Sequence, residues 1–269
     1  MNRRALVILV AVSVRVMNPA VVSGQTVESG FLDRTVTVNG AEFRYQVYVP
    51  REFQPSTSWP VILVLHGGGD YGSDGIRQTS IGLAHAIRQH ADRFPTLVVF
   101  PQSHADGTPG WQGKGGEAAL AELDKTIAEF NGDRSRVYLT GFSAGGNGAW
   151  YLALHHPELF AAVVPVCGHV TQHRGTTSGV FYPTIAPATD PDPYLAVARL
   201  VRSLPIWIFH GDADRTIPVE ESRQMFSALK SLGADVRYDE LPGAGHLDAI
   251  AAAYDSPDVM PWMLKQRKR

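Results

Sequence analysis

Five apolar runs recur along the chain, each of a length suited to one β-strand. They read "WPVILVLHGGG", "TLVVFPQ", "RVYLTGF", "FAAVVPVCG" and "PIWIFHGD". The stretch from Val61 to Leu65 contains no polar residue, which is typical of a strand buried on both faces of a sheet. A sixth run, "VRYDELPG", is more polar and is expected at a sheet edge.

Segments of helical length lie between these runs. They span residues 76–93, 117–130, 144–155 and 219–232, and "LAVARLVRSL" adds another. Strands that alternate with helices predict an α/β fold with a mostly parallel central sheet and helices on both faces. Near the N-terminus, "RTVTVNGAEFRYQVYVP" alternates in polarity around Asn39-Gly40 and predicts an antiparallel hairpin with a two-residue turn.

Residues 168–205 depart from this pattern. They are rich in glycine, proline and threonine and show no clear period before "LAVARLVRSL". A long irregular insertion in a compact domain is either a wall or lid of a functional site or a tolerated surface loop. We favour a wall that faces the substrate, and the surface loop stays the alternative.

Composition changes this picture little. The 269 residues are 44% hydrophobic and 19% charged, which is typical of a globular domain. The net charge of −2 gives no electrostatic reason to expect a nucleic-acid partner. With no internal repeat and no long linker, we predict one domain over residues 25–269.

The first residues resemble a signal peptide. Two arginines precede a largely apolar stretch from Ala5 to Val14, which is too short to span a bilayer. We predict a signal peptide over residues 1–24 with cleavage after Gly24, and a secreted or periplasmic protein without stable membrane insertion. A buried N-terminal strand is the alternative.

The segment "RVYLTGFSAGG" places Ser143 between two glycines, where a predicted strand gives way to a predicted helix. In such a turn the serine backbone is strained, and side chains at Gly141 and Gly145 would collide with the neighbouring strand and helix. The turn lifts the hydroxyl off the sheet, and the N-terminus of the following helix favours a developing negative charge. We predict Ser143 as a nucleophile, with a plain glycine-rich loop as the alternative.

A serine nucleophile needs a base and an acid that orients the base. In this type of fold the acid and then a histidine follow the serine at the ends of later strands. "PIWIFHGDADRTIP" supplies Asp212 and Asp214, and "LPGAGHLD" supplies His246. We predict a triad of Ser143, Asp214 and His246, and favour Asp214 over Asp212 because Asp212 directly follows the strand, where it can cap the turn.

Acyl transfer also needs two backbone N–H donors for the oxyanion. One is expected from Ala144, which follows the serine. The other is expected from the loop "LVLHGGGD", where we favour Gly68 over Gly69. This loop lacks the spacing of the common phosphate-binding loops, so a phosphate cradle is disfavoured.

The other histidines and the single cysteine have structural explanations. His66 and His210 precede glycine at strand ends, where they are expected to brace the loop backbone. His169 and His173 lack an acidic partner pattern, and Cys167 ends an apolar run as a small buried residue. No H-E-x-x-H motif or cysteine–histidine cluster indicates a metal.

Four motifs occur in order, "LHGGG", "GFSAGG", "HGDADRTIP" and "GAGH", and together they resemble the α/β-hydrolase superfamily from about Val47 onward. "PQSHADGTPGW" and "GNGAWYLALHHPELFAAVVPVCG" resemble single-domain secreted carboxylesterases, near feruloyl esterases, polyhydroxybutyrate depolymerases and peptidase-like sequences. The resemblance implies an α/β-hydrolase catalytic domain with Ser143 as nucleophile, His246 as base, Asp214 as orienting acid and no cofactor. Relatives often have an aromatic residue soon after the histidine, and this chain has "HLDAIAAAYD" instead.

The predicted activity is hydrolysis of a carboxylic ester, carried by a small molecule or a polymer, through an acyl-enzyme intermediate. Trp111, Phe142 and Tyr182 are candidates to line the substrate pocket, with the core as the alternative place for each. A serine peptidase needs the same triad. We favour esters because these 269 residues include no propeller or other gating domain. A non-catalytic binding protein on this fold would be expected to lack a triad member.

Overall fold

The computed structural model describes residues 28–104, 110–174, 181–187 and 190–268, so the predicted signal peptide lies outside the described residues. The strands are β1 (Gly30–Val38), β2 (Ala41–Val49), β3 (Trp59–Leu65), β4 (Leu97–Pro101), β5 (Gly132–Phe142), β6 (Ala162–Val166), β7 (His173–Arg174), β8 (Phe181–Tyr182), β9 (Ile206–Gly211) and β10 (Val236–Leu241). The α-helices are α1 (Leu83–Gln89), α2 (Lys114–Glu129), α3 (Ala144–His155), α4 (Pro193–Val201), α5 (Glu220–Ser231), α6 (Asp248–Tyr254) and α7 (Val259–Lys265). Within this described part, no helix has the length and apolar character needed to cross a membrane.

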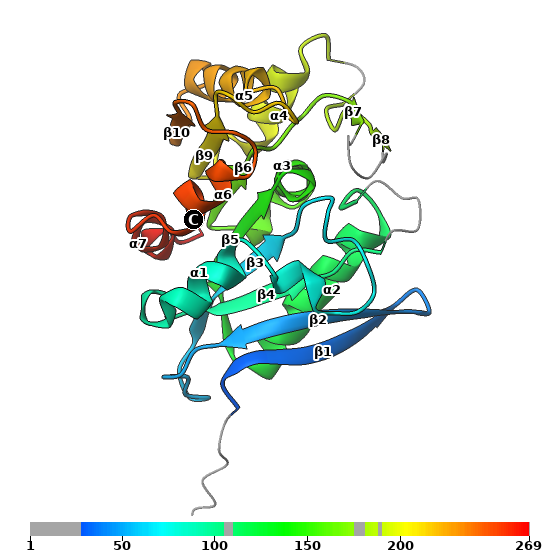
Figure 1. Ribbon diagram of the computed structural model, residues 1–269, viewed down its shortest axis with the longest axis vertical. Helices are drawn as coiled ribbons and strands as arrows, with labels where there is room; N and C mark the ends of the chain where they lie inside the picture. The colour runs from blue at the N-terminus through cyan, green and yellow to red at the C-terminus, as the bar shows by residue number, and fades with distance from the viewer. Residues whose placement is uncertain (1–27, 105–109, 175–180, 188–189, 269) are drawn as a thin grey trace, which may run out of the picture.

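Eight strands form one sheet in the order β1-β2-β4-β3-β5-β6-β9-β10 (Figure 1). β2 pairs antiparallel with both β1 and β4. The remaining neighbours in this order, from β4 through β3, β5, β6 and β9 to β10, pair in parallel. The predicted α/β architecture, a mostly parallel sheet with an N-terminal antiparallel hairpin, is therefore confirmed. The more polar β10 lies at an edge of the sheet, as its sequence predicts.

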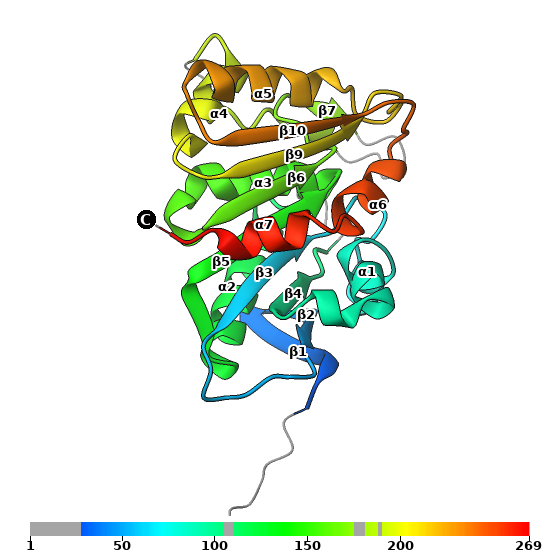
Figure 2. The same cartoon turned by 90° about the vertical axis from the view of Figure 1, so that its left-hand side faces the viewer.

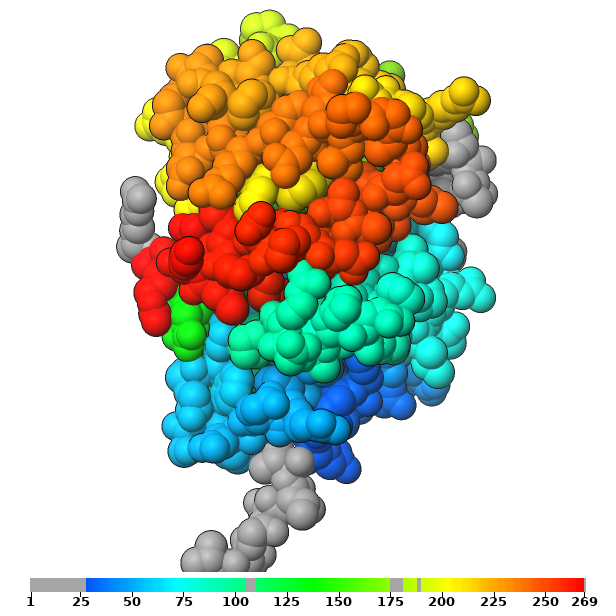
Figure 3. All heavy atoms as spheres, turned by 60° about the vertical axis from the view of Figure 1, so that its left-hand side comes forward, coloured from blue at the N-terminus to red at the C-terminus, as the bar shows by residue number. Residues whose placement is uncertain are grey.

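Residues of β3 show why both faces of the sheet need helices. Val61, Leu63 and Leu65 pack into one hydrophobic core, whereas Ile62 and Val64 pack into another. Successive side chains of a strand point to opposite faces, so an unbroken apolar run requires apolar cover on each side. Helices α2 to α5 contribute to the first core, and α1, α6 and α7 contribute to the second. Figure 2 shows the latter three helices on one face, and Figure 3 shows the C-terminal segment in red lying across it.

Two local predictions have different outcomes. Asn39 and Gly40 have φ angles of 49° and 79°, which suit a two-residue turn between paired strands, so the predicted hairpin is confirmed. The single helix expected over residues 76–93 is wrong. A 3-10 turn at Arg77–Thr79 is separated from α1 by Gly82, whose φ of 67° interrupts helical geometry.

The carboxyl ends of the parallel strands meet at one edge of the sheet, and the loops that follow β3, β5, β6, β9 and β10 all begin there. Ligand sites of open α/β sheets lie outside this edge. Residues 168–205 start from it as well. They contain the short pair β7–β8 and then α4, which Asp192 caps by accepting the N–H groups of Tyr194 and Leu195.

Candidate active site

Ser143 occupies a sharp turn between β5 and α3. Its backbone has φ 58° and ψ −115°, outside the regions that residues with a side chain favour. A Cβ atom at Gly141 would lie 2.2 Å from the Gly145 carbonyl oxygen, and one at Gly145 would lie 1.9 Å from the Leu65 carbonyl oxygen. Glycine is therefore required on both sides of the serine, for the steric reason that its sequence pattern indicates.

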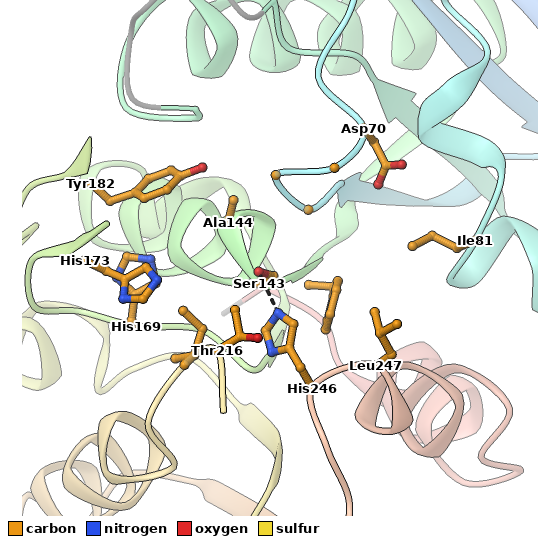
Figure 4. A pocket seen from close by; sticks show the side chains of 15 residues that line it. Asp70, Ile81, Ser143, Ala144, His169, His173, Tyr182, Thr216, His246 and Leu247 are labelled. Carbon is orange, nitrogen blue, oxygen red and sulfur yellow. Dashed lines mark hydrogen bonds between the residues drawn. The ribbon is translucent and has the colours of Figure 1, made fainter. Parts of the chain in front are cut away.

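The structure brings Ser143, His246 and Asp214 together from three loops. Ser143 Oγ lies 2.9 Å from His246 Nε2 (Figure 4). On the other side of the ring, His246 Nδ1 lies 2.6 Å from Asp214 Oδ2. When Nδ1–H donates to the carboxylate, Nε2 is left as the acceptor for the serine hydroxyl. The Phe142 ring packs against the imidazole with centroids 4.6 Å apart, which restricts rotation of the histidine.

Asp214 is buried yet ionised. Its side chain has no exposed surface, and its Oδ1 accepts the N–H groups of Thr216 and Ile217 at 2.7 and 3.0 Å. Burial by itself would raise the pKa of this carboxyl. Hydrogen bonds from His210 and His246 and from the Ile217 N–H outweigh burial and hold the pKa well below its ordinary value.

Two residues near Asp214 hold its loop in place. His210 Nε2 lies 3.2 Å from Asp214 Oδ2, and its Nδ1 lies 2.7 Å from the Ser222 hydroxyl oxygen. His210 thus fixes the aspartate loop, which extends the bracing role expected from its place at a strand end. The rejected alternative, Asp212, is exposed and accepts the Gly243 N–H at 2.6 Å, so it ties the aspartate loop to the loop that carries His246.

A cavity of about 320 Å³ opens at Ser143. Gly68 and Ala144, the predicted oxyanion donors, both line it, as do Gly67 and Gly69. The first N–H groups of a helix have no partner within the helix, so the Ala144 N–H at the start of α3 is available to a ligand. The N-terminus of α3 and the glycine loop therefore both lie at the cavity beside the serine.

His66 fixes the glycine loop. Its Nδ1 donates to the Gly67 carbonyl oxygen at 2.7 Å, and its Nε2 accepts the Ser103 N–H at 3.0 Å. Burial lowers the pKa of His66 to about 4, so the ring is neutral and has one donor and one acceptor for these two contacts. The predicted bracing role of His66 is confirmed.

A buried carboxylate anchors residues 168–205. Glu221 of α5 accepts the N–H groups of Val170 and Thr171 at 2.8 and 3.2 Å, the Thr171 hydroxyl, and the Tyr194 hydroxyl at 3.1 Å. These contacts tie the start of the segment and α4 to one acceptor. His169, His173 and Tyr182, which belong to the segment, line the cavity. The described part of the segment therefore forms a wall of the cavity.

Of the three predicted pocket residues, Phe142 and Tyr182 line the cavity and Trp111 does not. Trp111 is 1% exposed, and its Nε1 donates to the His66 carbonyl oxygen at 3.2 Å. A Cβ atom at Gly148 of α3 would lie 2.5 Å from the Trp111 side chain. Trp111 thus fills the core between α3 and the glycine loop, which corrects the prediction.

Sequence reasoning missed several lining residues, among them Asp70, His169, His173 and Thr216. Asp70 directly follows the three glycines, so its position was the one available signal. The two histidines lie in an irregular segment whose path no periodicity predicts. Their place at the cavity depends on the contacts of Glu221.

Within the described ranges, one group of residues brings three potential metal ligands together. Ligand atoms of Cys167, Asp214 and His246 lie within 4.8 Å of one another. The aspartate and the histidine are already hydrogen-bonded to each other. Burial raises the pKa of the Cys167 thiol well above its ordinary value, so the thiol keeps its proton. This group is therefore a poor match to the deprotonated donors that a metal requires.

The fold, together with the loops at the carboxyl ends of its parallel strands, is that of an α/β-hydrolase. A crystal structure described as a thermostable esterase superimposes with a TM-score of 0.70 and 27% identity over 88% of this chain and 63% of that one. Residues 104–267 match the prolyl oligopeptidase family, and the chain belongs to this family.

Two curated relatives carry names of ester hydrolases. Feruloyl esterase B of Neurospora crassa is 30% identical over 139 residues, which are 46% of this chain and 43% of that protein. Acetylxylan esterase A of Emericella nidulans is 28% identical over 155 residues, which are 54% of this chain and 46% of that protein. The matches thus span less than half of either relative.

Proposed function

We propose that this protein is a serine carboxylesterase, with Ser143 as nucleophile, His246 as general base and Asp214 as the acid that orients it. The observation that carries the proposal is the continuous chain of contacts from Ser143 Oγ through His246 to Asp214, at 2.9 and 2.6 Å. Gly68 and Ala144, the proposed oxyanion donors, line the same cavity as the serine.

The chemistry follows from this arrangement. His246 Nε2 takes the proton of the Ser143 hydroxyl as Oγ bonds to the ester carbonyl carbon. The N–H groups of Gly68 and Ala144 stabilise the oxyanion, and the ionised Asp214 stabilises the imidazolium. The alcohol departs with the proton from His246. Water then attacks the acyl-enzyme by the same route and releases the carboxylic acid.

The named relatives support ester substrates. Both curated relatives are called esterases, one for feruloyl and one for acetylxylan esters, and the superimposed crystal structure is called an esterase. The match to less than half of the curated relatives leaves the particular acyl and alcohol groups to experiment.

The test is a panel of acetyl to octanoyl esters, methyl ferulate and a peptide amide, assayed on wild type and Ser143→Ala. We expect ester turnover that falls more than about a thousandfold in the variant. Ser231→Ala, an exposed serine on α5, is the matched control and should retain wild-type turnover. Ester turnover that does not depend on Ser143 would contradict the proposal, and ester binding without turnover would favour a binding protein.

A serine peptidase is the second candidate, because the family to which the chain belongs is named for oligopeptidases. Ester and amide cleavage use the same triad and oxyanion donors. The amide in the panel separates the two. A larger kcat/KM for the amide than for every ester would replace the esterase proposal with the peptidase.

We also propose that the protein is exported to the cell exterior or the periplasm. The support is the arginine-led apolar stretch within residues 1–24. N-terminal sequencing of the mature protein is the test, with Gln25 expected as the first residue. Recovery from the cytoplasm with the leader intact would contradict export.

A further inference from the structure

Asp70 occupies a place in the cavity that the proposed chemistry does not use. It follows the glycine loop, is 8% exposed and lines the same cavity as Ser143. In Figure 4, Asp70, Ile81 and Leu247 lie on one side of the serine, and Tyr182, His169 and His173 lie on the other. The cavity therefore has two sides of different chemistry, and one of them contains a carboxyl group.

The backbone of Asp70 is fixed, but its carboxyl is not engaged. The Asp70 N–H donates to the Gly67 carbonyl oxygen at 3.2 Å, and its own carbonyl oxygen accepts Gln102 Nε2 at 3.2 Å. The described residues supply no hydrogen-bond donor to the carboxyl oxygens of Asp70. A nearly buried carboxyl without a partner is costly, and a donor from a ligand would offset that cost.

The pKa of Asp70 reflects this environment. Burial raises the pKa to about 6, and the charge of Arg77 offsets burial only in part. At neutral pH the group is therefore mostly a carboxylate, it faces the cavity, and no described side chain or backbone group donates to it. Asp214, in contrast, is buried but surrounded by donors.

The two histidines on the side of the cavity opposite Asp70 add no positive charge. The described lining contains no lysine or arginine. Burial lowers the pKa of His169 to about 4 and also lowers that of His173, so both rings are neutral at pH 7. A substrate with an anionic group would be repelled by the Asp70 carboxylate with no lysine or arginine in the lining to offset the repulsion, whereas a substrate with a donor group would satisfy it.

We propose that Asp70 is a specificity-determining residue, whose carboxyl accepts a hydrogen bond from a hydroxyl group of the ester substrate. This inference rests on the proposed esterase function and names the kind of ester that the cavity selects. A single hydroxyl matches the single carboxyl at this position. The flanking Ile81 and Leu247 are apolar, so their side chains supply no acceptor for the further N–H donors of an ammonium group.

Two matched sets of esters test the proposal, because the hydroxyl can belong to the alcohol or to the acyl group. The first compares glycerol monobutyrate with propyl butyrate. The second compares methyl 3-hydroxybutyrate with methyl butyrate and methyl 3-aminobutyrate. We expect wild type to prefer the hydroxyl-bearing ester in at least one set by about tenfold to a hundredfold in kcat/KM. Asp70→Leu should reduce this ratio to about one, and Asp70→Asn, which keeps one acceptor oxygen, should retain part of it.

Controls separate this proposal from the function on which it rests. Asp124→Asn replaces an exposed aspartate on α2 and should keep the wild-type ratio. Thermal unfolding of each variant checks that it folds. If Asp70→Leu does not fold, the ratio measured for Asp70→Asn tests the role of Asp70. If the esters are cleaved but the ratio of kcat/KM for the hydroxyl-bearing ester to that for the hydroxyl-free ester is the same in wild type and in the Asp70 variants, the role of Asp70 is overturned. The esterase function would stand in that case. If wild type prefers the amino ester and both Asp70→Leu and Asp70→Asn lose that preference, the proposal of a hydroxyl ligand is overturned in favour of an ammonium group.

Discussion

Two buried carboxyl groups occupy opposite kinds of environment in this molecule. Asp214, at the carboxyl end of the sheet, is held by two imidazoles and two backbone N–H groups. Glu122, on the inner face of α2, is 0% exposed, and neither carboxyl oxygen has a hydrogen-bond partner among the residues described. The pKa of Asp214 is lowered, whereas burial raises the pKa of Glu122 well above 4.5.

The contrast shows that hydrogen-bond donors decide whether a buried carboxyl group is ionised or keeps its proton. Donors around Asp214 keep a charge in a place that water does not reach, and such a charge can orient His246. Without donors, Glu122 retains its proton and contributes unpaired polar atoms to the core. Glu221 resembles Asp214 in having donors, but its donors belong to the wall of the cavity rather than to the proposed triad.

The largest effect is expected at Asp214. Asp214→Asn places an amide where the carboxylate should hold the His246 tautomer, so kcat/KM on esters should fall about ten-thousandfold. Steady-state kinetics on the most rapidly cleaved ester of the panel provides the measurement. Asp212→Asn is the matched control, since Asp212 contacts the Gly243 N–H instead, and it should stay within about threefold of wild type. Equal losses in the two variants would contradict the assignment.

An intermediate effect is expected at Glu221. Glu221→Ala leaves the buried N–H of Val170 and the N–H of Thr171 unpaired, so the free energy of unfolding should fall by about 3 kcal/mol. Urea unfolding followed by circular dichroism measures the change. The adjacent, exposed Glu220→Ala should change that free energy by less than about 0.5 kcal/mol. Matching values for the two variants would show that the wall is not anchored through Glu221.

The smallest effect, and one of opposite sign, is expected at Glu122. Glu122→Met removes unpaired polar atoms at similar volume, so the free energy of unfolding should rise by about 2 kcal/mol at pH 8. The rise should be smaller at pH 5. Because burial raises the pKa of Glu122, the folded protein keeps a proton that the unfolded chain releases near 4.5, and wild-type stability falls as pH increases above that value.

Urea unfolding at both pH values tests this prediction. Glu117→Met changes an exposed residue on the same helix and should have little effect at either pH. A Glu122→Met protein that is less stable than wild type at pH 8 would mean that the buried carboxyl finds a partner and belongs with Asp214 and Glu221.

Much of the fold could be predicted because its signals are local. Apolar runs such as Val61 to Leu65 predict buried strands, and Asn39-Gly40 predicts the hairpin turn. Prediction failed over residues 76–93, since the spacing of apolar residues suggested one helix and only the backbone shows that Gly82 interrupts it. Trp111 stayed open between the pocket and the core because bulk and aromaticity suit both equally, and only its packing against α3 decides for the core.

The sequence by itself determined the buried strands, the N-terminal hairpin, the glycine-flanked turn at Ser143, and which later loops carry an aspartate and a histidine. These features depend on short-range spacing and on backbone sterics, which neighbouring residues fix. Tertiary structure alone decided that Glu221 holds the start of residues 168–205, that Glu122 is enclosed without donors, and that Asp70 faces the cavity of Ser143. Each depends on how loops and helices far apart in the chain pack together, and burial and hydrogen bonding exist only once they do.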